Sequence, residues 1–259
     1  MKKYLFTSFL FALFLFGSNS SFASHIVGGD IRVQYTGTPN YFNITMNFFW
    51  DCNGAASNDD PLDIGVFDKV TNALVYTITV GTSYGTPPVT TTLSLGSGCY
   101  TPSICIKKSV YYQPNFYIAD NPNGYYLAYL RCCRNAAIAN IVTPTSEGFV
   151  AYTEMPNPAL HDNTPYFNTN PDGYMCLGVQ NQDGGFTATD PDGDVLVYSF
   201  STPLDCTPSG QCSNSGFGSG YGTPFPVPNP ELMATSHGQA PIPQVVRWEE
   251  YFLLIHLQD

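Results

Sequence analysis

The sequence predicts an all-β protein made of two immunoglobulin-like β-sandwich modules in tandem, the second of them incomplete. Short runs of alternating apolar and polar residues recur along the chain, and clusters of Gly, Pro, Asn and Asp separate them. Aromatic residues make up 15% of the 259 residues and charged residues only 11%. Many short strands joined by polar turns produce this composition. After Ala23, no segment keeps the apolar period of a helix.

The N-terminal segment, residues 1–23, has the pattern of a secretory signal peptide. Two lysines precede an apolar run, Tyr4–Phe16, and small residues stand at Ser21 and Ala23. This order predicts cleavage after Ala23, and the apolar run is too short to span a bilayer. We therefore expect a secreted or cell-surface chain that begins at Ser24 and is not inserted in a membrane.

The stretch SHIVGGD, which follows the cleavage site, resembles the activated N-terminus of a chymotrypsin-like protease. That mechanism needs a free amine at Ile26, and cleavage after Ala23 leaves Ile26 inside the chain. The protease also needs a nucleophilic serine on a glycine-rich turn, and the sequence contains no Gly-Asp-Ser-Gly-Gly turn. We therefore expect no enzymatic activity, and we interpret Gly28-Gly29 as a bend or bulge in the first strand.

The net charge restricts the class of partner. The chain carries 9 basic and 20 acidic residues, and loss of Lys2 and Lys3 with the signal peptide leaves a net charge of 7 − 20 = −13. Such a charge disfavours nucleic acids and anionic membrane surfaces and favours divalent cations. We expect a surface, matrix or glycan partner and no nucleic acid.

Residues 24–155 are predicted to form the first sandwich, with eight strands in antiparallel sheets. Turn signals such as Gly-Thr-Pro-Asn and Asn-Pro-Asn-Gly separate the strands. The expected strands are Ile26–Tyr35, Tyr41–Cys52, Leu62–Phe67, Ala73–Val80, Val89–Leu95, Ile104–Tyr112, Tyr125–Cys132 and Phe149–Thr153.

A change in amino-acid composition marks the expected end of this module. Residues 156–171 hold four prolines among Asn and Asp and are expected to be a linker or a first edge strand. Residues 172–259 are expected to form a partial cadherin-like or immunoglobulin-like module with an irregular C-terminal end. The final stretch, Val245–Asp259, lacks the turn residues found elsewhere, which suggests a truncated or frame-shifted product.

Eight cysteines in an exported chain indicate disulfide bonds rather than a metal site. Strand alternation places Cys52 and Cys132 on the predicted core faces of their strands, which favours a bridge between the two sheets. Two C-x5-C segments are expected to close their own loops, and the remaining two cysteines pair by elimination. A zinc site is disfavoured because short C-x2-C pairs and histidine partners are lacking. The expected pairs are Cys52–Cys132, Cys99–Cys105, Cys206–Cys212 and Cys133–Cys176.

The turn Asp190-Pro191-Asp192-Gly193-Asp194 holds the main cluster of candidate metal-ligating residues in the sequence. Three carboxylates at alternate positions predict a calcium site at Asp190, Asp192 and Asp194, because close acids repel one another without a counter-ion. Calcium binds six to eight oxygens, so carbonyls, water and another acid are needed, with Glu154 or Asp162 as the nearest acids in the linker. The alternative is a hairpin turn with solvated carboxylates.

Two function classes fit these features. The first is a non-enzymatic structural or adhesin-like module of the cell surface. The second is a glycan-binding module, in which the tyrosine pairs Tyr111-Tyr112 and Tyr125-Tyr126 stack on sugars. The same tyrosines also fit packing within and between strands.

Four motifs carry a resemblance to a known family. They are SHIVGGDI at the start of the expected mature chain, FFWDCNG at Phe48–Gly54, YLRCCRN at Tyr129–Asn135 and ATDPDGDVLVYS at Ala188–Ser199. In this order they resemble the N-terminal region of large secreted surface proteins of gliding bacteria, which end in a gliding-motility-associated sorting domain read by type IX secretion. The resemblance implies β-sandwich modules in an exported, adhesin-like or structural protein and supplies no catalytic residues.

Overall fold

A computed structural model describes residues 26–53, 58–94, 105–132, 134–135, 145, 148–168, 187–201, 204–205, 227–228 and 252–257. Its elements are antiparallel strands with almost no helix, which confirms the prediction of an all-β protein. The short 3-10 helices η1 (Thr82–Tyr84) and η3 (Pro158–Leu160) connect strands. Within the described residues, no helix is long and apolar enough to cross a membrane.

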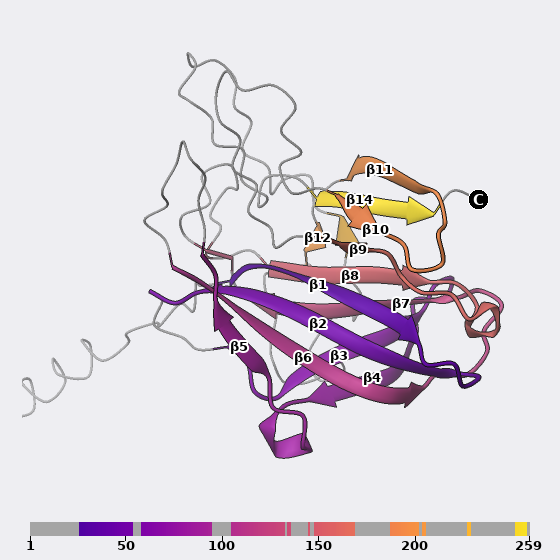
Figure 1. Ribbon diagram of the computed structural model, residues 1–259, viewed down its shortest axis with the longest axis horizontal. Coiled ribbons are helices and arrows are strands. Elements are labelled where there is room, and N and C mark those ends of the chain that lie inside the picture. Colours follow the sequence, from indigo (N-terminus) through magenta and orange to yellow (C-terminus); the bar gives the residue numbers. More distant parts are fainter. Residues whose placement is uncertain are drawn as a thin grey trace, which may run out of the picture.

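Two four-stranded sheets pack face to face over residues 26–155 (Figure 1). Their strands match the eight that the sequence predicts, with small shifts at the ends; the longest shift extends β6 to Tyr117. The first sheet has the order β1 (Ile26–Tyr35), β2 (Tyr41–Asp51), β6 (Ile106–Tyr117), β5 (Val89–Thr92). The second sheet has the order β4 (Leu74–Val80), β3 (Leu62–Asp68), β7 (Tyr125–Cys132), β8 (Gly148–Met155).

The opening glycines have the structural role that the sequence analysis assigns to them. The register of β1 against β2 shifts between Ile26 and Gly28, which is a bulge in the first strand. At Gly29, an added Cβ would lie 2.7 Å from the Asn47 carbonyl oxygen, so a side chain has no room there. The Ile-Val-Gly-Gly motif therefore lets β1 bend and approach β2 closely.

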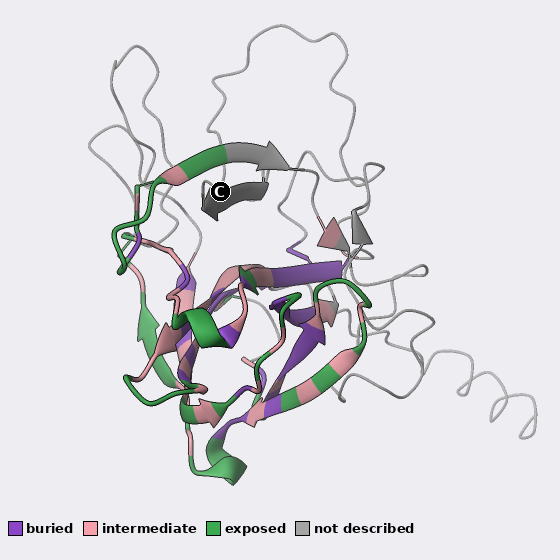
Figure 2. Cartoon of the chain, turned by 90° about the vertical axis from the view of Figure 1, so that its right-hand side faces the viewer, coloured by how far each residue is buried: buried purple, intermediate pink, exposed green. Residues whose placement is uncertain are grey.

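The core lies between the two sheets, where buried residues concentrate (Figure 2). Alternate residues of β2 point into it, including Ile44, Met46 and Phe48, as the strand period predicts. Rings from the opposite sheet meet them edge to face, with the Phe48 and Tyr129 centroids 5.7 Å apart. Trp50 closes one end of the core, and its indole N–H donates to the Ser109 hydroxyl at 3.0 Å. Packing of this kind fixes how the sheets sit against each other.

The core also encloses one ion pair. The guanidinium Nε of Arg131 lies 2.9 Å from a carboxylate oxygen of Asp59, and both side chains are largely buried. The Tyr129 hydroxyl donates to the same carboxylate, and the Tyr111 hydroxyl donates to the Asp59 carbonyl. A buried charge is tolerated when it is paired and hydrogen-bonded in this way.

The prediction of which face of β7 enters the core is wrong. Tyr125, Leu127 and Tyr129 line the core, whereas Tyr126 and Ala128 lie on the outer face of the sheet with Phe67. The outer face is itself buried, and the Phe67 and Tyr126 rings stack there with centroids 4.9 Å apart. A strand buried on both faces gives no alternation from which its orientation can be read.

The predicted disulfide pairing is wrong for the same reason. Cys52 is bonded to Cys105, with 5.4 Å between their Cα atoms, so neither Cys52–Cys132 nor Cys99–Cys105 forms. Cys52 follows Asp51 at the end of β2, Cys105 precedes Ile106 at the start of β6, and Asp51 and Ile106 are paired; the Cys52 N–H donates to the Cys105 carbonyl at 3.0 Å. The bridge therefore joins neighbouring strands of one sheet rather than facing sheets.

Beyond β8, the described strands form three two-stranded sheets that lie beside β1 and β8 (Figure 1). The strand β14, within the C-terminal stretch that lacked turn signals, pairs along the whole length of β11. The side chain of Leu204 packs on Leu130 and Val150 of the second sheet. The three pairs are β9 (Tyr166–Phe167) with β10 (Ala188–Thr189), β11 (Leu196–Ser201) with β14 (Phe252–Leu257), and β12 (Leu204–Asp205) with β13 (Val227–Pro228).

Candidate metal centre

The acidic turn after β10 is shaped by its first residue. The Oδ1 atom of Asp190 accepts hydrogen bonds from the backbone N–H groups of Asp192, at 2.8 Å, and Asp194, at 3.2 Å. Gly193 has a φ of 84°, in the left-handed region that favours glycine. Together these features fold the five residues so that the Asp192 and Asp194 side chains project from one small loop.

A single asparagine fastens this loop to the sandwich. The backbone N–H of Asn163 donates to Asp192 Oδ2 at 2.7 Å, and its side-chain Nδ2 donates to Asp192 Oδ1 at 2.8 Å. The Oδ1 atom of Asn163 accepts the backbone N–H of Tyr35, on the outer edge of β1, at 2.8 Å. The side chain of Asn163 thus contacts the acidic turn and the first strand at once.

The next residue extends the contact with β1. Thr164 Oγ1 accepts the N–H of Val33 at 2.9 Å, and the Thr164 N–H donates to the Val33 carbonyl at 2.9 Å. Backbone groups that an edge strand would otherwise expose are therefore satisfied by the segment after η3. The acidic turn is held against a rigid element of the fold.

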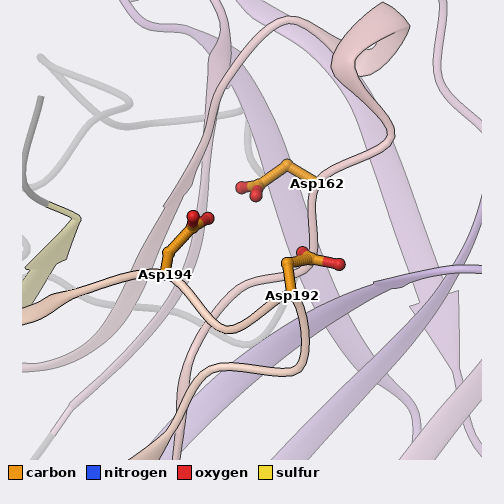
Figure 3. A group of neighbouring side chains, drawn as sticks. All are labelled: Asp162, Asp192 and Asp194. Atoms are coloured by element: carbon orange, nitrogen blue, oxygen red, sulfur yellow. The ribbon is translucent and has the colours of Figure 1, made fainter.

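Three carboxylates converge at this junction: Asp162, Asp192 and Asp194 (Figure 3). One oxygen from each lies within 4.8 Å of the others, and the Asp162 and Asp194 carboxylates face each other in the figure. Asp162 comes from the segment after η3 and is half-buried, whereas the other two residues are exposed. The cluster therefore joins two segments that are separate in the sequence.

The cluster is electrostatically unfavourable without a counter-ion. Partial burial, followed by repulsion from the carboxylates of Asp192, Asp190 and Asp194, raises the pKa of Asp162 to about 7. The ordinary pKa of an aspartate is 3.8, so burial and then the neighbouring acids both disfavour the charged form of Asp162. A bound cation would take the place of the proton that the neutral form carries.

The converging group differs from the predicted ligand set in one residue. It contains Asp162, expected only as a supplementary acid, and it does not contain Asp190, whose Oδ1 atom accepts two backbone N–H groups of the turn. Asp190 is 9% exposed, and its Oδ2 atom is buried with no hydrogen-bond partner. A buried carboxylate oxygen without a partner is rare and costly. It adds a fourth negative group beneath the loop.

The donor set fits calcium. Two oxygens on one calcium ion lie at most about 5 Å apart, roughly twice the bond length of 2.3–2.6 Å. The separation of 4.8 Å or less within the group meets this limit. Asp162, Asp192 and Asp194 would hold the ion with at least one oxygen each, and backbone carbonyls and water would supply the rest of the six to eight oxygens.

The second acid suggested for this site lies elsewhere. Glu154 forms an ion pair with Lys69 and accepts a hydrogen bond from the Tyr152 hydroxyl, on β8. It is not a member of the converging group. Glu154 is thus a comparison residue for the cluster rather than a ligand.

The predicted glycan-stacking tyrosines are mostly packed inside the fold. Tyr111, Tyr125 and Tyr126 are buried, and only Tyr112 is exposed. Burial removes the ring faces that a sugar would need, so Tyr111, Tyr125 and Tyr126 serve packing, whereas Tyr112 keeps an exposed ring.

Most predicted disulfide positions are not part of the structural description. Cys132 ends β7, where only the backbone is described. The pairs Cys206–Cys212 and Cys133–Cys176 stay predictions. Cys99, Cys133, Cys176, Cys206 and Cys212 lie outside the described residues.

Sequence reasoning did not identify Asn163 and Thr164. The signal for them is modest: Asp162-Asn163-Thr164-Pro165 places hydrogen-bonding side chains beside an acid within a proline-rich segment.

Comparison of the chain with models of known families, with curated proteins and with solved structures gives no match. The site is therefore interpreted from its own geometry.

Proposed function

We propose that this chain is a non-enzymatic structural or adhesin-like module of an exported surface protein, and that calcium locks its acidic turn onto the first sandwich. The observation that carries the proposal is the convergence of Asp162, Asp192 and Asp194 from two segments, above a buried and unpartnered oxygen of Asp190. A cation at this point ties the segments together and replaces repulsion by attraction.

The pattern of the N-terminal residues and the resemblance to surface proteins of gliding bacteria support export. In this proposal the sandwich of residues 26–155 is an immunoglobulin-like module, and β9 to β14 belong to a second one. We call the calcium-bound group of Asp162, Asp192 and Asp194 the calcium clamp. In this proposal it stiffens the junction between the two modules. Such stiffening is a mechanical task that needs no catalytic group.

The test is thermal unfolding of residues 24–259 in chelator and in millimolar calcium. Extracellular calcium modules bind with a Kd of roughly 10⁻⁴ to 10⁻³ M. A tenfold to hundredfold excess over Kd stabilises by about 1.4 to 2.7 kcal/mol. For a chain of this size we expect the Tm to rise by roughly 3 to 10 °C.

Two variants make the test specific. Asp194→Asn should abolish most of the calcium response, because it removes one converging carboxylate. The matched control Glu154→Gln removes an acid outside the group and should respond as the parent does. The proposed calcium clamp would be refuted if calcium left the Tm of the parent unchanged. It would also be refuted if sodium chloride of equal ionic strength raised the Tm by the same amount.

A further inference from the structure

The outer face of the first sheet carries three exposed tyrosines that the sandwich does not use. Tyr41 is 37% exposed, Tyr112 45% and Tyr117 50%. Phe42, Ile44 and Met46 of β2 point into the core, so the alternate residues of β2 lie on the outer face. We call Tyr41, Tyr112 and Tyr117 the tyrosine strip.

Strand register brings the tyrosine strip together. Tyr41 pairs with Tyr117 across β2 and β6, and Tyr112 pairs with Thr45 four residues further along β2. The Tyr41 and Tyr117 rings form an edge-to-face pair with centroids 5.5 Å apart. Four residues of a strand span about 13 Å. The strip is therefore long enough to contact more than one unit of a chain-like ligand.

The side chains between the rings are polar and neutral. Asn43 lies between Tyr41 and Thr45 on the outer face of β2, Thr45 stands directly opposite Tyr112, and Asn43 Oδ1 accepts the N–H of Asn115 at 3.1 Å. Within the described residues, no hydrogen bond engages the Asn43 amide nitrogen, the Thr45 hydroxyl or the hydroxyls of the tyrosine strip. These groups are available to hydrogen-bond a ligand.

The strand segments that carry the tyrosine strip are uncharged, and the nearest cation on this face is Arg32 of β1, which pairs with Thr45 across the strands and forms an ion pair with Asp30 at 3.3 Å. The segments Tyr41–Met46 and Tyr111–Tyr117 contain no Asp, Glu, Lys or Arg. The strands beyond β8 lie beside β1 and β8 (Figure 1), and the Arg32 guanidinium lies over the Tyr166 ring of β9 at 4.5 Å, which marks the border of the strip. The face at the tyrosine strip is thus exposed, aromatic and rich in hydrogen-bonding groups, with one paired cation at its border.

We propose that the tyrosine strip binds a neutral polysaccharide. A sugar ring presents an apolar C–H face, which packs on an aromatic ring, and hydroxyl groups at its edge, which hydrogen-bond amides and hydroxyls. The tyrosine strip supplies the rings, and Asn43 and Thr45 beside it supply the hydrogen-bonding groups. An acidic polymer gains little here, because neither segment has a cationic side chain and the neighbouring Arg32 is already engaged by Asp30 and the Tyr166 ring. This inference is independent of the calcium clamp, which lies at the outer edge of β1.

The experiment is native electrophoresis of residues 24–259 in gels that contain soluble xylan, laminarin, mannan or dextran, with polygalacturonate as the acidic comparison. We expect at least one neutral polymer to retard the protein and polygalacturonate not to. The double variant Tyr112→Ala with Tyr117→Ala should weaken retardation roughly tenfold or more, since each ring contributes about 0.5 to 1.5 kcal/mol.

Control variants separate stacking from loss of structure. Tyr84, in η1, is 59% exposed and lies outside the strip, so Tyr84→Ala should bind as the parent does. Tyr112→Phe with Tyr117→Phe keeps the rings and should keep most of the retardation. Absence of retardation by every neutral polymer would overturn the proposal. Equal loss in Tyr84→Ala, or self-association of the parent that the double variant abolishes, would overturn it too.

Retardation should persist in chelator, because the tyrosine strip does not contact the acidic cluster. Binding that vanishes with calcium removal would contradict the independence of the two sites. Failure of the calcium clamp alone would leave the polysaccharide result unchanged.

Discussion

At the residue scale, single polar side chains hold the turns of the sandwich, and Asp68 is the clearest example. It ends β3, and its Oδ1 atom accepts the N–H groups of Val70, at 3.0 Å, and Thr71, at 2.6 Å. Its Oδ2 atom accepts the side-chain amide of Asn121, from the loop between β6 and β7, at 2.7 Å. One carboxylate therefore organises its own turn and anchors a second loop.

These hydrogen bonds make stability depend on pH. The backbone N–H of Thr71, followed by the side chain of Asn121, holds the pKa of Asp68 well below its ordinary value of 3.8. A depressed folded-state pKa gives stability that is present above the unfolded pKa and is lost as pH falls through the folded pKa. We expect the Tm difference between parent and Asp68→Asn to be largest near about pH 6 and to shrink by about pH 3.

The matched control is Asp120→Asn. The exposed Asp120 carboxylate accepts a hydrogen bond from the Asn40 side chain, at 2.7 Å, so its substitution should cost less. Thermal unfolding followed by circular dichroism across this pH range checks both variants. A difference for Asp68→Asn that stays constant with pH would show that the carboxylate charge is not involved.

At the element scale, the sequence predicts strands well and their orientations less well. The apolar alternation in Tyr41–Asp51 defines both the strand and its core face, because the outer side is polar. The strand Tyr125–Cys132 is apolar on both sides, and both sides are buried, so the pattern cannot assign a core face. The predicted Cys52–Cys132 disulfide is wrong for this reason. It assumed that Cys132 lies on the core face of β7 and so faces the other sheet.

The corrected disulfide leads to a direct expectation. The Cys52–Cys105 bond closes a loop with a sequence separation of 53 residues, for which the chain-entropy model gives about 4 kcal/mol of stabilisation. We expect Cys52→Ala, Cys105→Ala and the double variant to lose similar amounts, because each removes the same bond. Urea unfolding measures the loss.

Peptide mapping without reduction provides the independent check. Digestion of the folded protein should release a peptide pair joined through Cys52 and Cys105. A Cys52–Cys132 link would restore a bridge between facing sheets and contradict the register at the ends of β2 and β6.

At the scale of the whole molecule, the chain beyond β8 contacts the sandwich at several points, of which two are of unlike chemistry. One is apolar, where Leu204 packs on Val150, and Arg134 donates to the Leu204 carbonyl at 3.0 Å. The other is polar, through Asn163 and Thr164 on the edge of β1. The polar contact carries the acidic cluster, so cation binding there acts on the first strand of the sandwich.

The sequence could indicate only part of this arrangement. The acids of the turn were evident from their spacing, and Asp162 was a candidate because it stood in the adjoining linker. The role of Asn163 could not be predicted, because it depends on a contact with Tyr35, 128 residues away. Contacts at such separation depend on how the sheets fold, which no local pattern encodes.

The coupling between cation and strand leads to the last expectation, which concerns amide hydrogen exchange in β1. The Val33 and Tyr35 amides donate to the side chains of Thr164 and Asn163 at the outer edge of the strand. If calcium fixes the acidic turn, and the turn holds Asn163, opening of this edge becomes less frequent. Exchange at both amides should then slow in millimolar calcium. The Trp50 indole N–H, which donates to Ser109 inside the core, should be far less affected.

In Asn163→Ala the bridge from Asp192 to Tyr35 is missing, so calcium should no longer protect the edge even where it still binds the carboxylates. Nuclear magnetic resonance can measure the amide exchange rates of parent and variant, with and without calcium, and so test whether calcium acts on the strand through Asn163. Equal protection in Asn163→Ala would mean that the cation stabilises the strand by another route.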